Sequence, residues 1–181
     1  MQDLAIVVPL KEFVLAKTRL REGGVDNVDT KIRDMASGVF SAARPRPLFV
    51  SCESDDVEEF ALQCSATPLR SSSTSLNEAV TFAYHALSSD FRRIMIVHAD
   101  LLYPEGLGDF DPFDGVTIVT DHHGRGTNVL VVPTGFDFTF RFGADSASSH
   151  QLEAQRTGVP HRLVRDSPWR YDVDEPGDLI V

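Results

Sequence analysis

Two kinds of segment are nearly absent from this sequence: cysteine motifs and long apolar runs. Cys52 and Cys64 are the only cysteines among 181 residues, and their spacing fits no metal or redox motif, as suits a reducing cytoplasm. No apolar stretch is long enough to cross a bilayer, and no basic region followed by a long apolar stretch opens the chain. We therefore expect a cytoplasmic protein without a signal peptide or membrane segment. The length and a hydrophobic content of 42% predict a single domain over residues 1–181.

Positive charge is also scarce, since 17 Lys and Arg residues stand against 27 Asp and Glu residues, giving a net charge of −10. Such a surface repels nucleic acid, so we expect no general DNA- or RNA-binding role. It also disfavours an anionic substrate, unless cations gather locally or a metal ion assists. The first 21 residues are the exception, because they hold the basic residues Lys11, Lys17, Arg19 and Arg21. This basic segment is either an anion site or a solvated face, and charge alone does not decide between the two.

Short β-branched apolar runs alternate along the chain with segments of helical periodicity. The predicted strands are Leu4–Val8, Leu48–Val50, Arg93–His98, Gly115–Thr120 and Asn128–Val132. The predicted helices are Thr30–Ala42, Asp55–Gln63, Ser75–Leu87 and Ser146–Thr157, the last closed by Gly158. This alternation predicts an α/β fold with a mostly parallel sheet covered on both faces. Ligands of such sheets bind beyond the carboxyl ends of the strands. Chemistry is therefore expected in the loops after Val8, Val50, Val97 and Thr120.

Acidic residues stand at two places where they could hold a metal ion. Asp100 follows a predicted strand, where a carboxylate is either a turn or cap residue or a metal ligand. Asp172 and Asp174 alternate along an extended segment and so point the same way. One of them could cap a short helix that starts at Glu175–Pro176, and the other could meet Asp100 across a site. Mg²⁺ is usually held by one or two carboxylates together with substrate phosphates, which suits two distant acids.

The basic segment directly follows the first predicted strand, so its loop lies where phosphates could be wrapped by Lys and Arg. It is not a Walker loop, because the Gly-x₄-Gly-Lys pattern is absent. It is not a Rossmann fingerprint either, since no glycine follows the strand. Phosphates bound here would be held mainly by side chains.

Two glycine-containing segments could let backbone approach a ligand. Gly124–Asn128 lies between two predicted strands and is either a ligand loop or an ordinary turn. Gly143 precedes the helix that starts near Ser146, and helix N-termini bind anions through free N–H groups. Asp145 or Ser146 could instead be the cap of that helix. His150 lies one turn further on the same face, a position more typical of a structural histidine.

Together these segments resemble one family, the guanylyltransferases that make the guanosine-diphosphate-activated precursor of the deazaflavin coenzyme F-420. The matching blocks are Val8–Lys11 with Ala16–Leu20, Gly126–Leu130 with Phe140–Gly143, Ser146 and His150, and Asp172–Leu179. Leu76, Asn77 and the strand end at Asp100 fit as well. The resemblance spans nearly the whole chain. No block is unique alone, and the specificity lies in their order and spacing.

The resemblance implies a single-domain, three-layer nucleotidyltransferase fold, similar to that of nucleotide-diphospho-sugar transferases. It implies transfer of GMP from GTP to a three-carbon phosphorylated acid: phosphoenolpyruvate, 2-phospho-L-lactate or 3-phospho-D-glycerate. Of these we favour phosphoenolpyruvate, as the general expectation for a bacterial member. The residues that would hold the GTP phosphates, and so act in catalysis, are Lys11, Lys17 and Arg19. Those beside the guanine would be Leu76 and Asn77. Those holding Mg²⁺ would be Asp100 and Asp172, with Asp174 as a further candidate. Those holding the acceptor's carboxylate and phosphate would be Thr127, Gly143 and Ser146.

The chain departs from the family pattern next to both acidic segments. Ala99-Asp-Leu-Leu stands where the family usually has Gly-Asp-Leu-Pro, which leaves the course of the loop after Asp100 open. Asp174-Glu-Pro-Gly-Asp-Leu replaces Asp-Thr-Pro-Glu-Asp-Leu and so lacks a capping hydroxyl. No acid is lost. Two alternatives stay open: a nucleotidyltransferase for a sugar phosphate or a molybdenum-cofactor precursor, and a non-catalytic nucleotide-binding protein of the same fold.

Overall fold

One seven-stranded sheet forms the centre of the protein, whose computed structural model describes residues 1–13 and 17–180. Ala16 of the basic segment lies outside the described residues. The strands are β1 Gln2–Pro9, β2 Leu48–Cys52, β3 Thr67–Arg70, β4 Phe91–Val97, β5 Val116–Thr120, β6 Thr127–Pro133 and β7 His161–Val164. Their order is β3-β2-β1-β4-β6-β5-β7. All neighbours pair in parallel except β6, which is antiparallel to β4 and β5. The predicted α/β fold with a mostly parallel sheet is confirmed.

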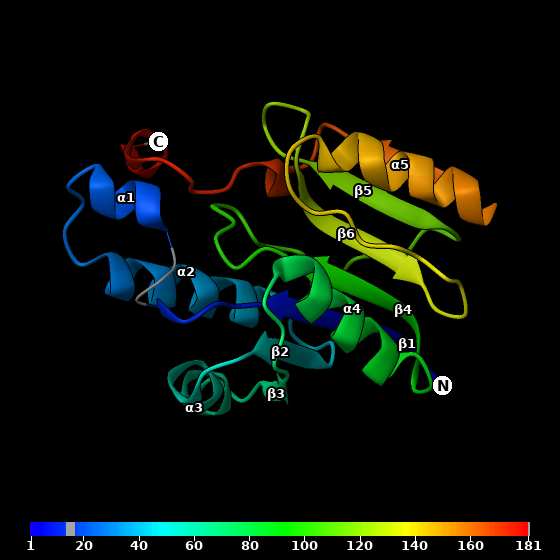
Figure 1. Ribbon diagram of the computed structural model, residues 1–181, viewed down its shortest axis with the longest axis horizontal. Coiled ribbons are helices and arrows are strands. Elements are labelled where there is room, and N and C mark those ends of the chain that lie inside the picture. Colours follow the sequence, from blue (N-terminus) through cyan, green and yellow to red (C-terminus); the bar gives the residue numbers. More distant parts are fainter. Residues whose placement is uncertain (14–16, 181) are drawn as a thin grey trace.

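Helices cover both faces of this sheet and give three layers (Figure 1). They are α1 Thr18–Glu22, α2 Val28–Ala42, α3 Asp55–Gln63, α4 Leu76–Leu87 and α5 Ser146–Thr157, with the 3₁₀ turns η2 Pro168–Arg170 and η3 Pro176–Ile180. The core beneath α2 and α3 is separate from the core beneath α4 and α5. No helix in the described part of the chain combines the length and apolarity that crossing a bilayer requires.

The central strand β1 shows why the predicted strands read as continuous apolar runs. Leu4, Ile6 and Val8 belong to the core beneath α2 and α3, whereas Ala5 and Val7 belong to the core beneath α4 and α5. Successive side chains of a strand point to opposite faces, so a strand covered on both faces needs apolar residues at every position. The carboxyl end of this strand leads into the loop that carries the basic segment.

Capping residues set the helix boundaries close to those predicted. The Ser75 side chain accepts a hydrogen bond from the backbone N–H of Glu78, and the Glu78 carboxylate accepts one from the backbone N–H of Thr74. These reciprocal bonds start α4 in the manner of a capping box. The helix α5 ends at Gly158, as predicted, and the φ of this glycine, 70°, is left-handed.

The strands β3 and β7 and the helix α1 were not predicted from the sequence. The edge strand β3 has exposed ends and contains Pro68, which weakens its strand pattern, and β7 is only partly buried. The helix α1 spans only five residues, too few for a periodic signal. The predicted short helix at Glu175–Pro176 is confirmed as the turn η3.

Candidate functional site

The two acidic segments, more than seventy residues apart in sequence, pair with each other beyond the end of β4. The backbone N–H of Leu102 donates to the carbonyl of Tyr171 over 2.9 Å, and that of Val173 donates to the carbonyl of Asp100 over 3.1 Å. This short antiparallel bridge sets the course of the loop after Asp100. It brings Asp100 and Asp172 together, as predicted.

Asp100 and Asp172 form a cluster with His98, in which one possible ligand atom from each residue lies within 4.8 Å of the others. Asp172 is held in place by Asn128, whose side-chain Nδ2 donates to Asp172 Oδ1 over 3.0 Å. Within the described residues, His98 Nε2 and Asp100 Oδ1 are buried without a hydrogen-bond partner. Burial, and then the charge of Asp100, raise the pKa of Asp172. Two crowded carboxylates and two unpaired buried polar atoms are what a divalent cation would satisfy, so the donor set fits one.

His98 is a member of this cluster that the sequence analysis did not identify. A signal was present, because His98 and Asp100 are two residues apart at a strand end. Side chains at that spacing leave an extended chain on the same side. The strand β4 ends at Val97, one residue before the predicted end, so both residues belong to the loop segment at the sheet's carboxyl edge.

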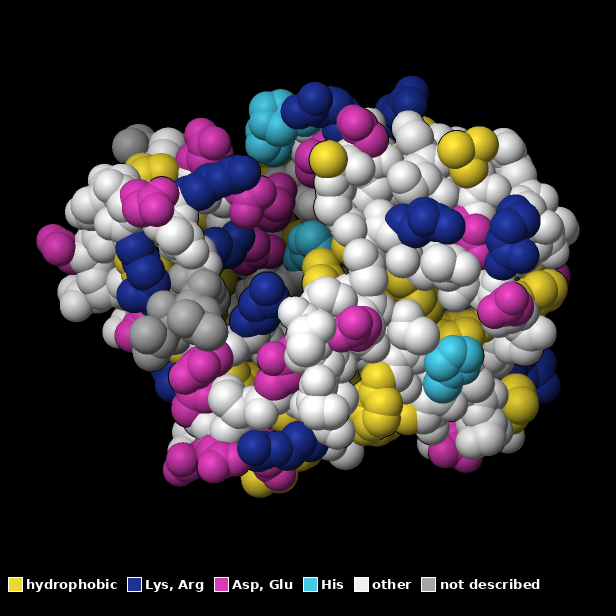
Figure 2. Space-filling model, in the orientation of Figure 1, with side chains coloured by type: hydrophobic (Ala, Val, Ile, Leu, Met, Phe, Trp, Pro, Cys, Tyr) yellow, Lys and Arg dark blue, Asp and Glu magenta, His cyan; other side chains and the backbone are white. Residues whose placement is uncertain are grey.

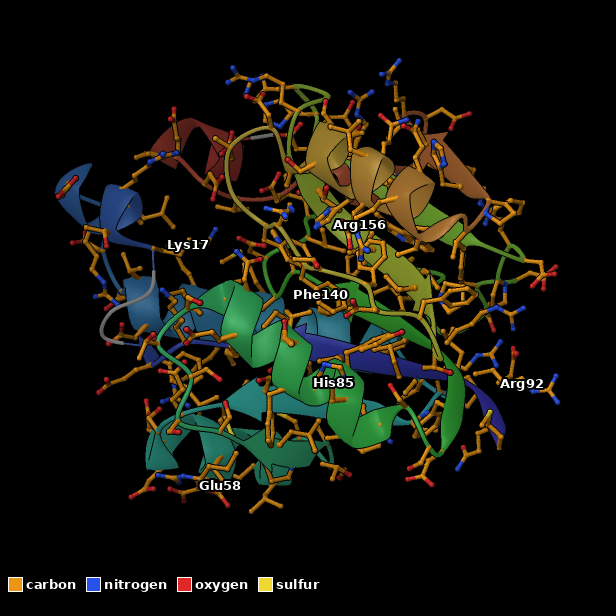
Figure 3. All side chains as sticks on the ribbon, turned by 45° about the vertical axis from the view of Figure 1, so that its right-hand side comes forward. Lys17, Glu58, His85, Arg92, Phe140 and Arg156 are labelled. Carbon is orange, nitrogen blue, oxygen red and sulfur yellow. The ribbon has the colours of Figure 1, made fainter. Side chains whose placement is uncertain are left out.

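Asp174, predicted as a further metal candidate, lies next to the cluster and contacts Lys17 instead. The Lys17 ammonium donates to Asp174 Oδ1 over 2.9 Å and also to Asp100 Oδ2. Burial opposes the charge on Lys17, but the two carboxylates outweigh it and raise the Lys17 pKa. Burial also opposes the charge on Asp174, and Lys17 reverses this effect and lowers its pKa. The lysine is therefore a fixed cation between the two acids, and Figure 3 shows it extending from the start of α1.

The helix α1 reaches the site because it packs on the C-terminal turn. A Cβ on Gly23 would lie 2.4 Å from Cγ of Pro176, so only glycine allows this approach. Arg19 and Glu175, both exposed, lie 3.9 Å apart across the same contact. Figure 1 shows α1 beside the C-terminal end of the chain. The N-terminal cations are thereby placed over the C-terminal acids.

Two adjoining cavities open at this edge of the sheet. The smaller, of about 460 Å³, is lined by Lys11, Lys17, Arg19, Asp100 and Asp174, among others. The structure thus gathers all three predicted phosphate-binding cations. The larger, of about 820 Å³, shares Arg19 and Asp174 with the smaller one. Figure 2 shows the hollow, in which acidic, basic and histidine side chains meet. Both volumes lie in the range of small-molecule sites.

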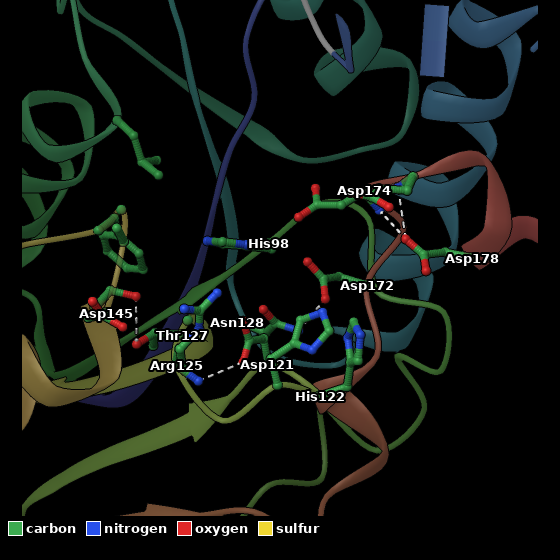
Figure 4. Close-up of a pocket in the computed structure, with 18 of the residues that line it drawn as sticks. His98, Asp121, His122, Arg125, Thr127, Asn128, Asp145, Asp172, Asp174 and Asp178 are labelled. Carbon is green, nitrogen blue, oxygen red and sulfur yellow. Dashed lines mark hydrogen bonds between the residues drawn. The ribbon is translucent and has the colours of Figure 1, made fainter. Parts of the chain in front are cut away.

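The larger cavity contains the predicted acceptor residues. Its lining includes Thr127, Gly143 and Ser146. The predicted metal ligand Asp172 also lines it, and so does Leu76, which was predicted beside the guanine. Figure 4 shows Asp172 and Asp174 on one side of it, Thr127 and Asp145 on the other, and His98 between them. The loop between β5 and β6 adds Arg125, a lining cation that the sequence analysis did not single out. Of the four strand-end loops predicted to carry chemistry, the described loop after Val50 lines neither cavity.

Thr127 is fixed as a hydrogen-bond donor by its buried neighbours. The backbone N–H of Arg141 donates to His150 Nε2 over 3.1 Å, so the neutral ring carries its hydrogen on Nδ1. That Nδ1–H faces Thr127 Oγ1 at 3.1 Å, and the Ser146 hydroxyl donates to the same oxygen over 3.2 Å. With both lone pairs engaged, Thr127 has its own hydrogen left for a ligand in the cavity. Burial, with a smaller contribution from His98, lowers the His150 pKa to about 4 and keeps the ring neutral.

The lowered His150 pKa predicts an acid-sensitive stability. The unfolded chain binds a proton below pH 6.5 that the folded protein binds only near pH 4, so stability is lost as the pH falls through this window. Between pH 7.5 and pH 5, we expect the wild type to lose about 1–2 kcal/mol more unfolding free energy than His150→Gln. Urea unfolding of both proteins at the two pH values measures this. Equal losses would show that His150 is not the group responsible.

Asn77 hydrogen-bonds to the backbone of a distant residue, and the Asp145 side chain does not cap its helix. The Asn77 side chain donates to the carbonyl of Phe142 over 3.1 Å and accepts from its N–H over 2.7 Å. It ties α4 to the wall of the larger cavity, and its place beside guanine stays a prediction. Asp145 occupies the N-cap position of α5 but its side chain makes no capping bond.

Gly143, with φ of 133°, has a backbone conformation that favours glycine.

Comparison with known proteins identifies the family of this chain. Residues 4–181 match the family described as "Guanylyl transferase CofC like". A phosphoenolpyruvate guanylyltransferase of Roseiflexus castenholzii is 30% identical over 98% of this chain and 87% of its own length. One of Sphaerobacter thermophilus is 29% identical over 96% and 89%.

Solved structures support the fold at lower sequence identity. A nucleotide-diphospho-sugar transferase candidate from Desulfovibrio desulfuricans G20 has a TM-score of 0.73 and 19% identity, covering 99% of this chain and 85% of its own. A nucleotidyl transferase from Methanothermobacter thermautotroptrophicus has a TM-score of 0.70 and 13% identity, with 98% and 94% covered. The predicted nucleotidyltransferase fold is confirmed, and the chain belongs to the family of CofC-like guanylyl transferases.

Proposed function

We propose that this protein transfers GMP from GTP to a three-carbon phosphorylated acid, with phosphoenolpyruvate as the favoured acceptor, in the biosynthesis of coenzyme F-420. The observation that carries the proposal is the junction of two cavities at Asp174 and Arg19, beside the acidic cluster. A triphosphate in the basic cavity and an anion in the larger cavity would meet there. The names of the two relatives support phosphoenolpyruvate over the other acids.

In the proposed reaction an oxygen of the acceptor's phosphate attacks the α-phosphorus of GTP. A new O–P bond forms, the bond between the α-phosphorus and its bridging oxygen breaks, and pyrophosphate leaves with that oxygen. A phosphate monoester has a second pKa of ~6, so the nucleophile is already ionised at neutral pH and no general base is needed. The protein's work is therefore positioning and charge neutralisation.

Each group of residues has a part in this work. Lys11, Lys17 and Arg19 would bind the phosphates of GTP and the departing pyrophosphate. Thr127 would donate its free hydroxyl hydrogen to the acceptor. Asp100 and Asp172 would hold Mg²⁺, which when bound offsets the repulsion between the two phosphate groups. The whole chain, residues 1–181, would act as one guanylyltransferase domain.

The test is pyrophosphate release from protein, GTP and Mg²⁺ with each of the three acids added separately. We expect release with phosphoenolpyruvate and only background release when no acid is present. Parallel reactions with ATP, CTP or UTP test the nucleotide, and a sugar phosphate tests the rival acceptor class. Release with a sugar phosphate but with none of the three acids would overturn the proposal. So would binding of GTP without release under any of these conditions.

A further inference from the structure

The acidic cluster contains a nitrogen donor, which a simple carboxylate site for Mg²⁺ does not require. We propose that His98 is a third ligand of the cation that Asp100 and Asp172 would hold. We propose further that the site binds Mn²⁺ more tightly than Mg²⁺. This inference rests on the proposed function only in assigning the cation to the same site. The observation behind it is the juxtaposition of one nitrogen and two carboxylates within 4.8 Å.

The surroundings of His98 hold its ring at the cavity. Its backbone N–H donates to the carbonyl of Asn128 over 3.0 Å, which continues the pairing of β4 with β6 by one residue. The imidazole lies against the ring of Phe142, with the ring centroids 5.7 Å apart. Phe142 is itself held by Asn77 through two hydrogen bonds. The ring is therefore supported from the backbone and from one face.

Two of the three cluster residues carry a buried polar atom without a hydrogen-bond partner in the described structure. His98 Nε2 is buried and lacks a partner among the described residues, and so does Asp100 Oδ1. A buried polar atom without a partner costs free energy, so its retention calls for an explanation such as a bound ion. The other Asp100 oxygen contacts Lys17, which leaves Oδ1 as the unengaged one. At Asp172, the Asn128 side chain donates a hydrogen bond to Oδ1 and holds the carboxylate in place.

Ligand chemistry separates Mn²⁺ from Mg²⁺ at this site. Mg²⁺ prefers oxygen ligands and gives up its waters reluctantly. Imidazole suits first-row transition ions, whose affinity for mixed nitrogen and oxygen sites exceeds that of Mg²⁺. Carboxylates and phosphate oxygens also suit Mn²⁺, so Mn²⁺ could serve the substrate phosphates as well as the imidazole. A site of this composition therefore favours Mn²⁺ over Mg²⁺.

The test uses the protein with MnCl₂ or MgCl₂ alone, without nucleotide or acceptor. Calorimetric titration gives both affinities for the wild type, His98→Gln and the control His85→Gln, which changes an exposed histidine of α4. We expect the wild type to bind Mn²⁺ at least about tenfold more tightly than Mg²⁺. His98→Gln is expected to lose roughly tenfold to a hundredfold in Mn²⁺ affinity and little in Mg²⁺ affinity, with no change for His85→Gln.

A spectroscopic measurement keeps the inference testable if His98→Gln folds poorly. Pulsed electron paramagnetic resonance of Mn²⁺ bound to the wild type should show coupling to a directly bound imidazole nitrogen. Absence of that coupling, or equal Mn²⁺ affinity in wild type and folded His98→Gln, would overturn the inference. Either result would leave the proposed function intact if guanylyl transfer occurs. Failure of guanylyl transfer with His98-dependent Mn²⁺ binding would count against the proposed function alone.

Discussion

Asp100→Asn is expected to lower kcat/KM by roughly two to four orders of magnitude while the protein stays folded. Asp100 supplies one of the two carboxylates that lie together beyond β4, and asparagine keeps its shape but removes its charge. A neutral amide weakens the hold on a divalent cation. It also leaves Lys17 with one acidic partner instead of two. Steady-state pyrophosphate release, with circular dichroism to check the fold, measures the effect.

Asp109→Asn is a matched control for this variant. Asp109 is exposed, follows the same loop and lines neither described cavity, so the same chemical change there should leave activity unaltered. Near-normal GTP consumption by folded Asp100→Asn would contradict the role of Asp100. An equal loss in Asp109→Asn would point to a general effect of charge instead.

Lys17→Ala is expected to weaken GTP binding by roughly tenfold to a hundredfold, the scale of one or two charge-assisted hydrogen bonds. In the structure described here the ammonium lies between Asp100 and Asp174 at the wall of the smaller cavity. A divalent cation that neutralised Asp100 would leave the ammonium available to the triphosphate. Calorimetry with Mg²⁺ and a GTP analogue that cannot react at the α-phosphorus measures the affinity without turnover.

Arg92→Ala provides the comparison for Lys17→Ala. Arg92 is an exposed cation near the start of β4, at the end of the strand opposite the site, and Figure 3 shows it far from Lys17. Removing it changes the net charge equally without touching either cavity. Unchanged GTP affinity in Lys17→Ala would remove Lys17 from the GTP site. Equal weakening in both variants would reduce its effect to long-range electrostatics.

The local sequence pattern was sufficient to predict those strands and helices that depend mainly on their own residues. The strand β1 is apolar and buried from Leu4 to Val8 because both of its faces are covered there. The helices α3 and α5 were predicted with the bounds they have, and Gly158 marks the end of α5. The strand end at Asp100 followed from the same reasoning. These features depend on periodicity and composition over a few residues.

The remaining features depend on contacts between distant segments. The antiparallel direction of β6 is set by its neighbours β4 and β5, and its own apolar run does not reveal it. The pairing of Asp174 with Lys17 requires α1 to pack on η3 at Gly23 and Pro176. Asn77 uses both ends of its amide on Phe142, 65 residues away. The family resemblance pointed to Lys17, Asn77 and Asp174, and their individual contacts required the fold.

The identity of the product tests the central claim most directly. Phosphorus-31 magnetic resonance of a reaction with GTP, Mg²⁺ and phosphoenolpyruvate follows every phosphate at once. We predict a pair of coupled signals from a new phosphorus–oxygen–phosphorus link between GMP and the acid, growing in step with pyrophosphate, and growing far more slowly with Asp100→Asn. Unchanged GTP, or its conversion to GDP and inorganic phosphate without a new link, would contradict guanylyl transfer to phosphoenolpyruvate by this protein.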